Sequence, residues 1–155
     1  MNRHTFFKNL ALAALASLTL TMSAFAQKAT KPEAEALVAK SVAYIKTHGT
    51  EKAYVDFTTN AAFRDRELYV IVYDLTGKNL AHGANPKLVG KDLIGMKDPD
   101  GKLLNKILVD LAKEKGKGWS EEFKFRNPVT DALQRRTVYV ERVGETFVGV
   151  GVFLD

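Results

Sequence analysis

Cysteine is absent from the 155-residue sequence, which excludes disulfide bonds, thiol catalysis and thiolate metal sites. Histidine is scarce, with three residues in all. The sequence also lacks the Gly-x-Ser-x-Gly motif that places a catalytic serine on a strand-to-helix turn. It has no basic stripe interleaved with aromatic residues, of the kind that binds nucleic acid. Nucleophilic catalysis and nucleic-acid binding are therefore poorly supported, and the fold must rely on its hydrophobic core.

Carboxylates that could form a metal site are few and badly spaced. Residues 98–101, Asp-Pro-Asp-Gly, resemble the start of a calcium loop, but the third acid and the closing glutamate are missing. Pro99 suits the start of a helix instead. Glu121 and Glu122 are adjacent, so in a strand they would point to opposite faces. We therefore expect no metal site, no cofactor and no enzymatic activity.

A long apolar run occurs only near the N-terminus. Arg3 and Lys8 precede the run, and residues 24–26, Ala-Phe-Ala, have the small residues of a signal-peptidase site. About 20 unbroken apolar residues would be needed to span a membrane, and serine and threonine interrupt this run. We interpret residues 1–26 as a cleaved secretory signal peptide and residues 27–155 as one domain without a membrane span. Loss of Arg3 and Lys8 takes the net charge from +5 to +3.

Apolar residues at helical spacing predict three helices. A capping box formed by Thr30 and Glu33 begins the first helix, and Gly49 ends it. Thr50 begins a short second helix. A leucine-rich third helix opens at residues 98–101 and ends near Gly116.

Runs of β-branched, aromatic and apolar residues predict strands. The predicted strands are residues 68–73, 80–82, 119–125, 135–142 and 147–154. The first is central, because Tyr69, Ile71 and Tyr73 cover one face and their even-numbered neighbours cover the other. In the last strand Gly149 and Gly151 share a face, so another group approaches it closely.

These elements predict an α+β domain with a long N-terminal helix packed on a five-stranded antiparallel sheet. The third helix and a lid, residues 83–94, would cover the other sheet face. Tyr73, Trp119 and Tyr139 carry hydrogen-bond donors, and Arg136 lies on the strand of Tyr139. Donors beside a guanidinium group favour a carboxylate ligand. The alternative is a structural or protein-interaction module whose pocket is filled by its own side chains.

Several segments resemble, in order and spacing, the single Cache family of extracellular sensor domains, which have a PAS-like fold. The segments are residues 69–82, 85–93, 97–102, 118–119, 127–130, 139–143 and 148–152. The resemblance implies a pocket for a small organic acid on the sheet face opposite the first helix. It also implies a role in signal transduction or chemotaxis through a membrane receptor or histidine kinase.

The resemblance further implies which residues bind the ligand. The candidates are Tyr73, His82, Lys91, Trp119, Arg136 and Tyr139. Arg135 is the alternative to Arg136, because in a regular strand it shares a face with Tyr139. Since the sequence has no helix after its last strand, we expect a periplasmic binding protein that presents its ligand to a receptor.

Overall fold

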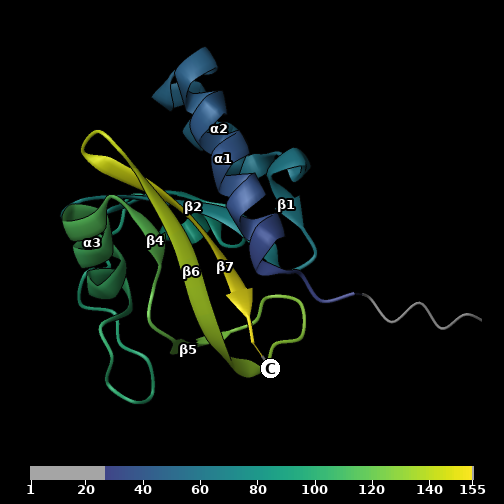
Figure 1. Cartoon of the computed structure of the whole chain (residues 1–155), viewed down its shortest axis with the longest axis vertical. Helices are drawn as coiled ribbons and strands as arrows, with labels where there is room; N and C mark the ends of the chain where they lie inside the picture. The colour runs from purple at the N-terminus through teal and green to yellow at the C-terminus, as the bar shows by residue number, and fades with distance from the viewer. Residues whose placement is uncertain (1–26, 155) are drawn as a thin grey trace, which may run out of the picture.

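The computed structural model describes residues 27–154 of the chain. The predicted signal peptide, residues 1–26, and its cleavage site lie outside the described residues. Within the described part, no helix combines the length and the apolar character that a membrane crossing requires. The described residues form three α-helices, two short 3-10 helices and seven strands (Figure 1).

Helix α1 (Lys31–His48) begins with the predicted capping box. The Thr30 hydroxyl accepts a hydrogen bond from the Glu33 amide (3.4 Å), and the Glu33 carboxylate accepts one from the Thr30 amide (2.7 Å). Gly49, with a φ of 81°, ends α1 and directly precedes α2 (Thr50–Thr59). Because a positive φ is strained for residues with a Cβ, glycine permits this sharp change of direction.

Helix α3 (Leu104–Lys115) begins later than the sequence predicts. The preceding residues, 98–101, form a turn instead of a first helical turn. The Asp98 carboxylate accepts hydrogen bonds from the amides of Asp100 (2.9 Å) and Lys102 (2.9 Å). The acidic motif is therefore occupied in closing a turn of the backbone.

All strand pairs in the sheet are antiparallel, as predicted. Strands β1 to β4 are Arg64–Asp65, Leu68–Asp74, Asn79–His82 and Lys117–Trp119, and β5 to β7 are Phe123–Arg126, Leu133–Val143 and Thr146–Phe153. The order is β1-β2-β7-β6-β4, with β3 paired to β2 and β5 paired to β6. The sheet has seven strands rather than five because β1 is added and the strand predicted at 119–125 is divided.

The division of that strand changes which residues share a face. Trp119 pairs with Tyr139, whereas Phe123 pairs with Arg136. Four steps along β4–β5 therefore match three steps along β6, so one extra residue is inserted. Such an irregularity reverses the alternation of side chains. A single regular strand over residues 119–125 would place Trp119 and Phe123 on one side, and the inserted residue places them on opposite faces.

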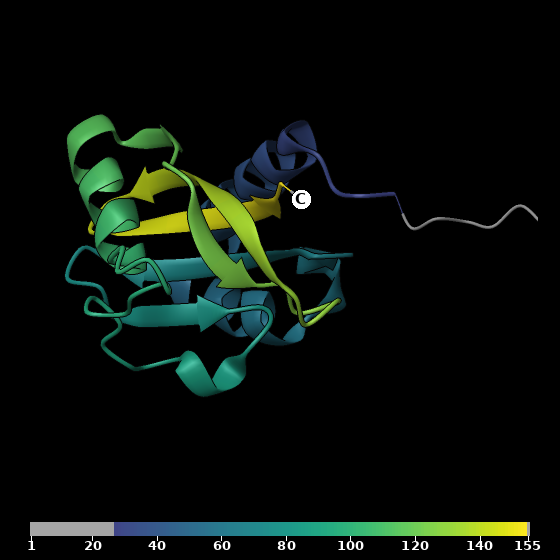
Figure 2. The same cartoon turned by 90° about the horizontal axis from the view of Figure 1, so that it is seen from below.

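Each face of the sheet has its own hydrophobic core. On one face, α1 and α2 pack against the even-numbered residues of β2, including Leu68, Val70 and Val72. On the other face, α3 packs against Tyr69, Ile71 and Tyr73. Figures 1 and 2 show α1 and α3 on opposite sides of the sheet. Both the central position of β2 and the two covered faces are confirmed.

The segment after β3 crosses to the α3 face. The 3-10 helices are Ala61–Phe63, before β1, and Pro86–Leu88, in this segment. The backbone N–H of Asn79 in β3 donates to Lys91 O (2.9 Å), and the Asn79 carbonyl oxygen accepts from the Gly90 amide (2.8 Å). The chain around Gly90 and Lys91 therefore runs beside β3. Leu93, Ile94 and Met96 then pack into the α3-side core, where the sequence places a lid.

Candidate functional site

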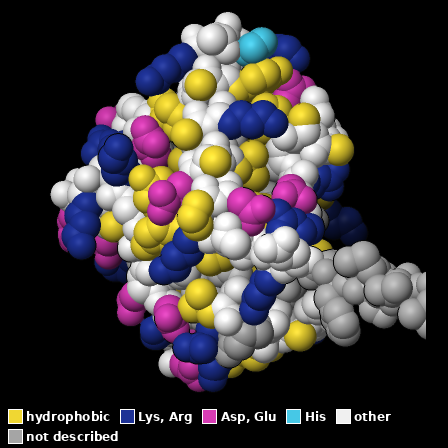
Figure 3. All heavy atoms as spheres, turned by 45° about the vertical axis from the view of Figure 1, so that its right-hand side comes forward, with side chains coloured by type: hydrophobic (Ala, Val, Ile, Leu, Met, Phe, Trp, Pro, Cys, Tyr) yellow, Lys and Arg dark blue, Asp and Glu magenta, His cyan; other side chains and the backbone are white. Residues whose placement is uncertain are grey.

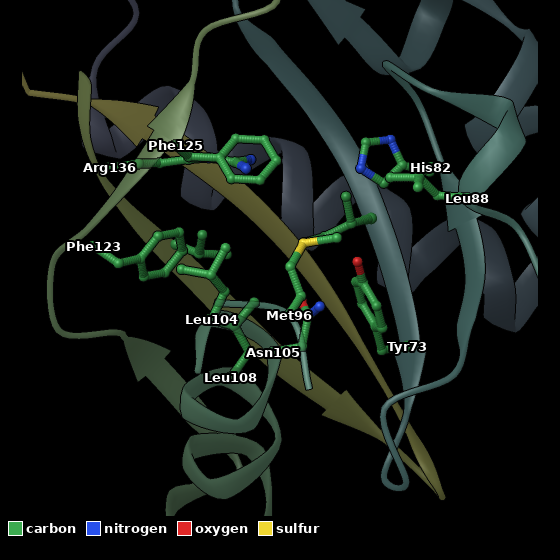
Figure 4. Close-up of a pocket in the computed structure, with 12 residues that line it drawn as sticks. Tyr73, His82, Leu88, Met96, Leu104, Asn105, Leu108, Phe123, Phe125 and Arg136 are labelled. Atoms are coloured by element: carbon green, nitrogen blue, oxygen red, sulfur yellow. The ribbon is translucent and has the colours of Figure 1, made fainter. Parts of the chain in front are cut away.

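A small cavity lies between the sheet and α3 (Figure 4). Most of its lining residues are apolar, and polar groups come from Tyr73, His82, Asn105 and Arg136. No aspartate or glutamate lines it. The enclosed volume is about 20 Å³, little more than one water molecule requires. The cavity is therefore a confined space surrounded by hydrogen-bond donors.

Arg136 is the charged residue of this cavity and is 3% exposed. Its guanidinium carbon lies 4.9 Å from the centre of the Tyr69 ring, 5.1 Å from that of Phe125 and 5.4 Å from that of Phe153. These contacts offset part of the cost of burying a cation. Nε and Nη2 nevertheless have no hydrogen-bond partner among the described residues. A buried cation with unpaired donors is ready to receive an anion.

The guanidinium of Arg136 lies against the backbone of Gly151 in β7. A Cβ atom at this position would overlap the Nε atom of Arg136. At Gly149 a Cβ would be 3.1 Å from side-chain atoms of Ile71 and Val138. The close approach that the two glycines predict is confirmed, and at Gly151 the approaching group is the cavity's cation.

His82 is a neutral donor on the opposite side of the cavity from Arg136 (Figure 4). Its Nδ1 atom accepts hydrogen bonds from the amides of Asn85 (2.9 Å) and Ala84 (3.3 Å). Since a backbone N–H group can only donate, Nδ1 must be the acceptor and carries no proton. The proton of the neutral imidazole is therefore on Nε2. Burial, and then the charge of Arg136, lower the pKa of His82 to about 4. The imidazole is therefore uncharged near neutral pH.

Two phenols on β2 face the same side of the sheet. Burial is the main cause that raises the pKa of Tyr73 to about 12. Tyr73 therefore keeps its proton and can donate it in a hydrogen bond. The Tyr69 hydroxyl is buried without a partner among the described residues, and its ring lies 5.2 Å from that of His82. Together these groups present neutral donors around one fixed positive charge.

A second, larger chamber adjoins the cavity. Its volume is about 270 Å³, and its walls include Tyr69, Leu88, Phe125 and Pro128. His82, Leu88 and Phe125 line both spaces. The small cavity and the larger chamber are called the inner cavity and the outer chamber below.

The sequence over residues 1–155 matches the family model of Single Cache domain 2. The chain belongs to this family. Cache domains are extracellular or periplasmic sensor domains of chemoreceptors and histidine kinases, and they are sensory rather than catalytic. The resemblance found in the sequence and the predicted α+β Cache fold are confirmed.

Two characterised relatives contain a segment similar to this Cache domain. It is 30% identical over 93 residues to the methyl-accepting chemotaxis protein McpP of Pseudomonas putida, covering 59% of this chain and 17% of McpP. It is 30% identical over 90 residues to the sensor histidine kinase MctS of Rhizobium johnstonii, covering 56% of this chain and 19% of MctS. The chain thus spans less than a fifth of the length of each relative.

Solved structures of chemotaxis sensors share the fold. A methyl-accepting chemotaxis protein of Vibrio parahaemolyticus superimposes with a TM-score of 0.70 at 25% identity, covering 81% of this chain and 88% of that one. A periplasmic sensor domain of a chemotaxis protein gives 0.63 at 26% identity, covering 80% and 90%. A Cache chemosensory domain described for carboxylic acid recognition gives 0.62 at 23% identity, covering 80% and 88%.

Three of the six predicted site residues meet in this Cache domain. Tyr73 from β2, His82 from β3 and Arg136 from β6 line the inner cavity. Arg135, the alternative to Arg136, lies outside it and forms an exposed ion pair with Glu122 (3.1 Å). Strand β6 pairs with β7 without a bulge from Arg136 to Val143, so the two arginines point to opposite faces.

The other three predicted residues lie elsewhere. Trp119 and Tyr139 pack on the α1 face, where the Trp119 indole donates to a Glu35 carboxylate oxygen (2.7 Å). Lys91 is exposed and lines neither the inner cavity nor the outer chamber. Their placement in the pocket is therefore corrected: strand parity moves the two aromatic residues to the other face, and Lys91 lies at the edge beside β3.

Sequence reasoning did not select three residues that shape the site. Tyr69 lies on the same face of β2 as Tyr73, so the alternation of side chains along the strand was sufficient to select it. Asn105 is buried in α3 and donates to Leu93 O (2.8 Å), tying the lid to the helix. Met96 fills part of the cavity from the loop before α3. No periodic pattern marks a loop residue such as Met96.

Proposed function

We propose that this chain is an exported, periplasmic sensor domain that binds a small organic acid in the inner cavity. The domain would act without catalysis, in signal transduction or chemotaxis, through a membrane receptor or histidine kinase. Residues 1–26 would be removed as a signal peptide, leaving residues 27–155 as the Cache domain. The mass of the purified exported protein tests this step, with a chain beginning at Gln27 as the expected product.

The observation that carries the proposal is the state of Arg136. Burial of an unpaired charge costs several kcal/mol in proteins, and the inner cavity holds no acidic side chain to offset it. A carboxylate ligand would supply the missing charge and would accept hydrogen bonds from the unpaired Nε and Nη2 atoms. Tyr73 and the Nε2 hydrogen of His82 would complete its coordination from the other side.

The relatives support the same function. McpP is a chemotaxis protein, and MctS is a sensor histidine kinase, and these are the two kinds of signalling protein named in the proposal. One structural neighbour is described for carboxylic acid recognition, the ligand chemistry that Arg136 favours. On the face shown in Figure 3, basic and acidic side chains are interspersed, which is unlike a nucleic-acid-binding surface.

The absence of catalysis is supported by the chemistry of the inner cavity. Its titratable groups are two groups held neutral, Tyr73 and His82, and one guanidinium. None of these is a nucleophile paired with a base. Within the described residues, no three His, Asp or Glu side chains gather where they could hold a metal ion.

A thermal-shift screen of the purified protein against small carboxylates, amino acids and purines tests the proposal. A ligand at a hundred times its dissociation constant stabilises the fold by about 2.7 kcal/mol. We expect carboxylates to give this shift.

Arg136→Ala should weaken binding by about 2–5 kcal/mol, roughly thirtyfold to several thousandfold. Arg136→Lys should retain part of the affinity, because it keeps the charge and loses the two-pronged contact.

Arg135→Ala is the matched control. It removes the same charge from the neighbouring position of β6, but its side chain is half exposed and paired with Glu122. Isolated surface ion pairs contribute roughly 0–1 kcal/mol, so the dissociation constant should stay within about a factor of two. Equal losses in the two variants would contradict a specific role for Arg136.

The alternative function is a structural or protein-interaction module of the periplasm with a self-filled pocket. The small volume of the inner cavity favours it, since Met96, Leu104 and Phe123 already occupy much of the space. The same screen discriminates between the two. If no compound class shifts the melting temperature, the interaction module is the better interpretation.

A further inference from the structure

The inner cavity and the outer chamber differ in size and chemistry. The outer chamber is more than ten times larger, at about 270 Å³ against about 20 Å³. Tyr69, Leu88, Phe125 and Pro128 provide apolar walls. The two spaces lie on either side of the side chains that they share, His82, Leu88 and Phe125. A second neighbouring space, of about 140 Å³, shares Phe123 with the inner cavity, but its other lining residues are all charged. The outer chamber is therefore the larger of the two neighbouring spaces and the one with apolar walls.

The size of the inner cavity limits what it can hold. A volume of about 20 Å³ is little more than one water molecule requires. A carboxylate group fits such a space, but the carbon chain attached to it needs further room. That room lies past Leu88 and Phe125, where the walls are apolar.

The charges around the outer chamber also restrict the ligand. Among the residues that line it, the formally charged side chains are Arg126 and Asp131. These two pair with each other, at 3.3 Å between Arg126 Nη1 and Asp131 Oδ1. A second carboxylate on the ligand would meet apolar walls and an arginine that already pairs with Asp131, so the outer chamber offers it no free cation.

We infer that the outer chamber binds the apolar tail of the ligand whose carboxylate occupies the inner cavity. The ligand class is then a monocarboxylic acid with an aliphatic or aromatic tail longer than the methyl group of acetate. This inference rests on the proposed function, because the carboxylate at Arg136 sets the direction of the tail. Leu88 and Phe125 become the residues that determine specificity for tail length.

Calorimetric titration of the purified protein with sodium acetate, butyrate, hexanoate, benzoate and succinate tests the inference. Affinity should rise by about fourfold for each methylene buried, which corresponds to ~0.8 kcal/mol. Benzoate should bind more tightly than acetate, and succinate more weakly than butyrate. Acetate binding as tightly as hexanoate would overturn the inference and leave the proposed function intact. Failure of every acid to bind would overturn both.

A variant separates a tail site from a mere entry path. Ala84→Trp adds bulk inside the outer chamber, which Ala84 lines without lining the inner cavity. It should reduce hexanoate to the affinity of acetate, while acetate itself changes by less than about twofold. Val55→Trp is the control, because Val55 is an exposed valine on α2 and should leave the whole series unchanged. Leu88→Ala, at the shared wall, should weaken hexanoate more than acetate. An unaltered dependence on chain length in both Ala84→Trp and Leu88→Ala would overturn the inference.

Discussion

The two faces of the sheet are built on the same strands but differ in how their buried polar groups are paired. On the α1 side, the Ser41 hydroxyl donates to Leu37 O (2.8 Å), and the Thr137 hydroxyl donates to Ser120 O (2.8 Å). On the α3 side, Tyr69 and Arg136 bury three polar atoms without a partner among the described residues. Unpaired buried groups cost stability. The α3 face is therefore the less completely paired of the two, which is the cost that the proposed binding site would carry.

The largest effect is expected on the α1 face. Phe57 is fully buried there and packs against Phe63, with ring centres 4.7 Å apart. Phe57→Ala should lower the free energy of unfolding by about 3–5 kcal/mol, measured by urea denaturation. Affinity for the acid should stay within about twofold, since Phe57 does not line the inner cavity. Val55→Ala, on the exposed side of α2, is the control. A folded Phe57→Ala protein that no longer binds the acid would contradict the assignment of stability to the α1 face and of binding to the α3 face.

Arg136→Met should separate stability from binding on the α3 face. Methionine fills a similar space without a charge, so the free domain should gain about 1–4 kcal/mol in unfolding free energy. Ligand binding should be lost in the same protein. Chemical denaturation without ligand and calorimetry with ligand measure the two quantities. Arg135→Met, at an exposed ion pair, should change neither by more than about 1 kcal/mol. Destabilisation of the free Arg136→Met protein would contradict the cost assigned to the buried charge.

Acid should weaken the fold through His82. Its pKa falls from 6.5 to about 4 on folding, so between these values the unfolded chain binds the proton and the folded chain does not. Stability is therefore complete above pH 6.5 and should fall by up to about 3 kcal/mol as the pH decreases toward 4. Tyr69, Tyr73 and Arg136 are the ionisable groups that face the imidazole, and none is a carboxylate. Unfolding free energies measured at several pH values test this.

The matched variant for this titration is His82→Asn. The asparagine oxygen can accept the amide hydrogens that Nδ1 accepts in His82, and asparagine does not titrate. The dependence on pH between 6.5 and 4.5 should become flatter. Carboxylates whose pKa is lowered on folding do not interfere between pH 6.5 and 4.5. Glu33 is an example: its pKa is lowered from 4.5 to about 2, so the stability that it contributes is lost only below pH 4.5. An unchanged slope in the variant would assign the effect to other groups.

The smallest effect is expected for aromatic residues of the α1 face that the sequence places in the pocket. Tyr139→Phe should leave the dissociation constant of the acid within about twofold, because Tyr139 packs against Trp119 on the far side of the sheet. Glu35→Gln, at the exposed hydrogen bond to Trp119, should change stability by less than about 1 kcal/mol. Titration calorimetry of Tyr139→Phe checks the point, with Tyr73→Phe as the pocket-side counterpart that should weaken binding.

Local patterns were sufficient for the presence of the helices, for the strands at residues 68–73 and 80–82 and for the two faces of β2. The alternation of Tyr69, Ile71 and Tyr73 predicts correctly that they share a face, because β2 pairs with β7 without a register shift. Two alternate glycine positions on β7 predict a close approach, and the Arg136 guanidinium provides it at Gly151. In each case the signal lies within a few residues of the feature that it predicts.

The arrangement of the site depends on pairings that local patterns do not contain. Whether Trp119 lies with Phe123 depends on the extra residue between β4 and β5, which is visible only against β6. The position in the family selects Arg136, which lines the inner cavity, whereas the alternation along β6 shows that Tyr139 lies on the other face. The contribution of Met96 depends on how the loop before α3 folds over the sheet.

The contact between Arg136 and Gly151 couples two positions that are 15 residues apart and belong to paired strands. A side chain at position 151 would displace the guanidinium, whereas a smaller residue at position 136 would leave a void above the glycine. A smaller residue at position 136 or a side chain at position 151 therefore loses packing when it is introduced alone. Where the arginine is exchanged for a smaller residue during divergence, we expect the glycine to be replaced with it. Such a pair of replacements would also remove the buried cation on which the proposed anion binding depends.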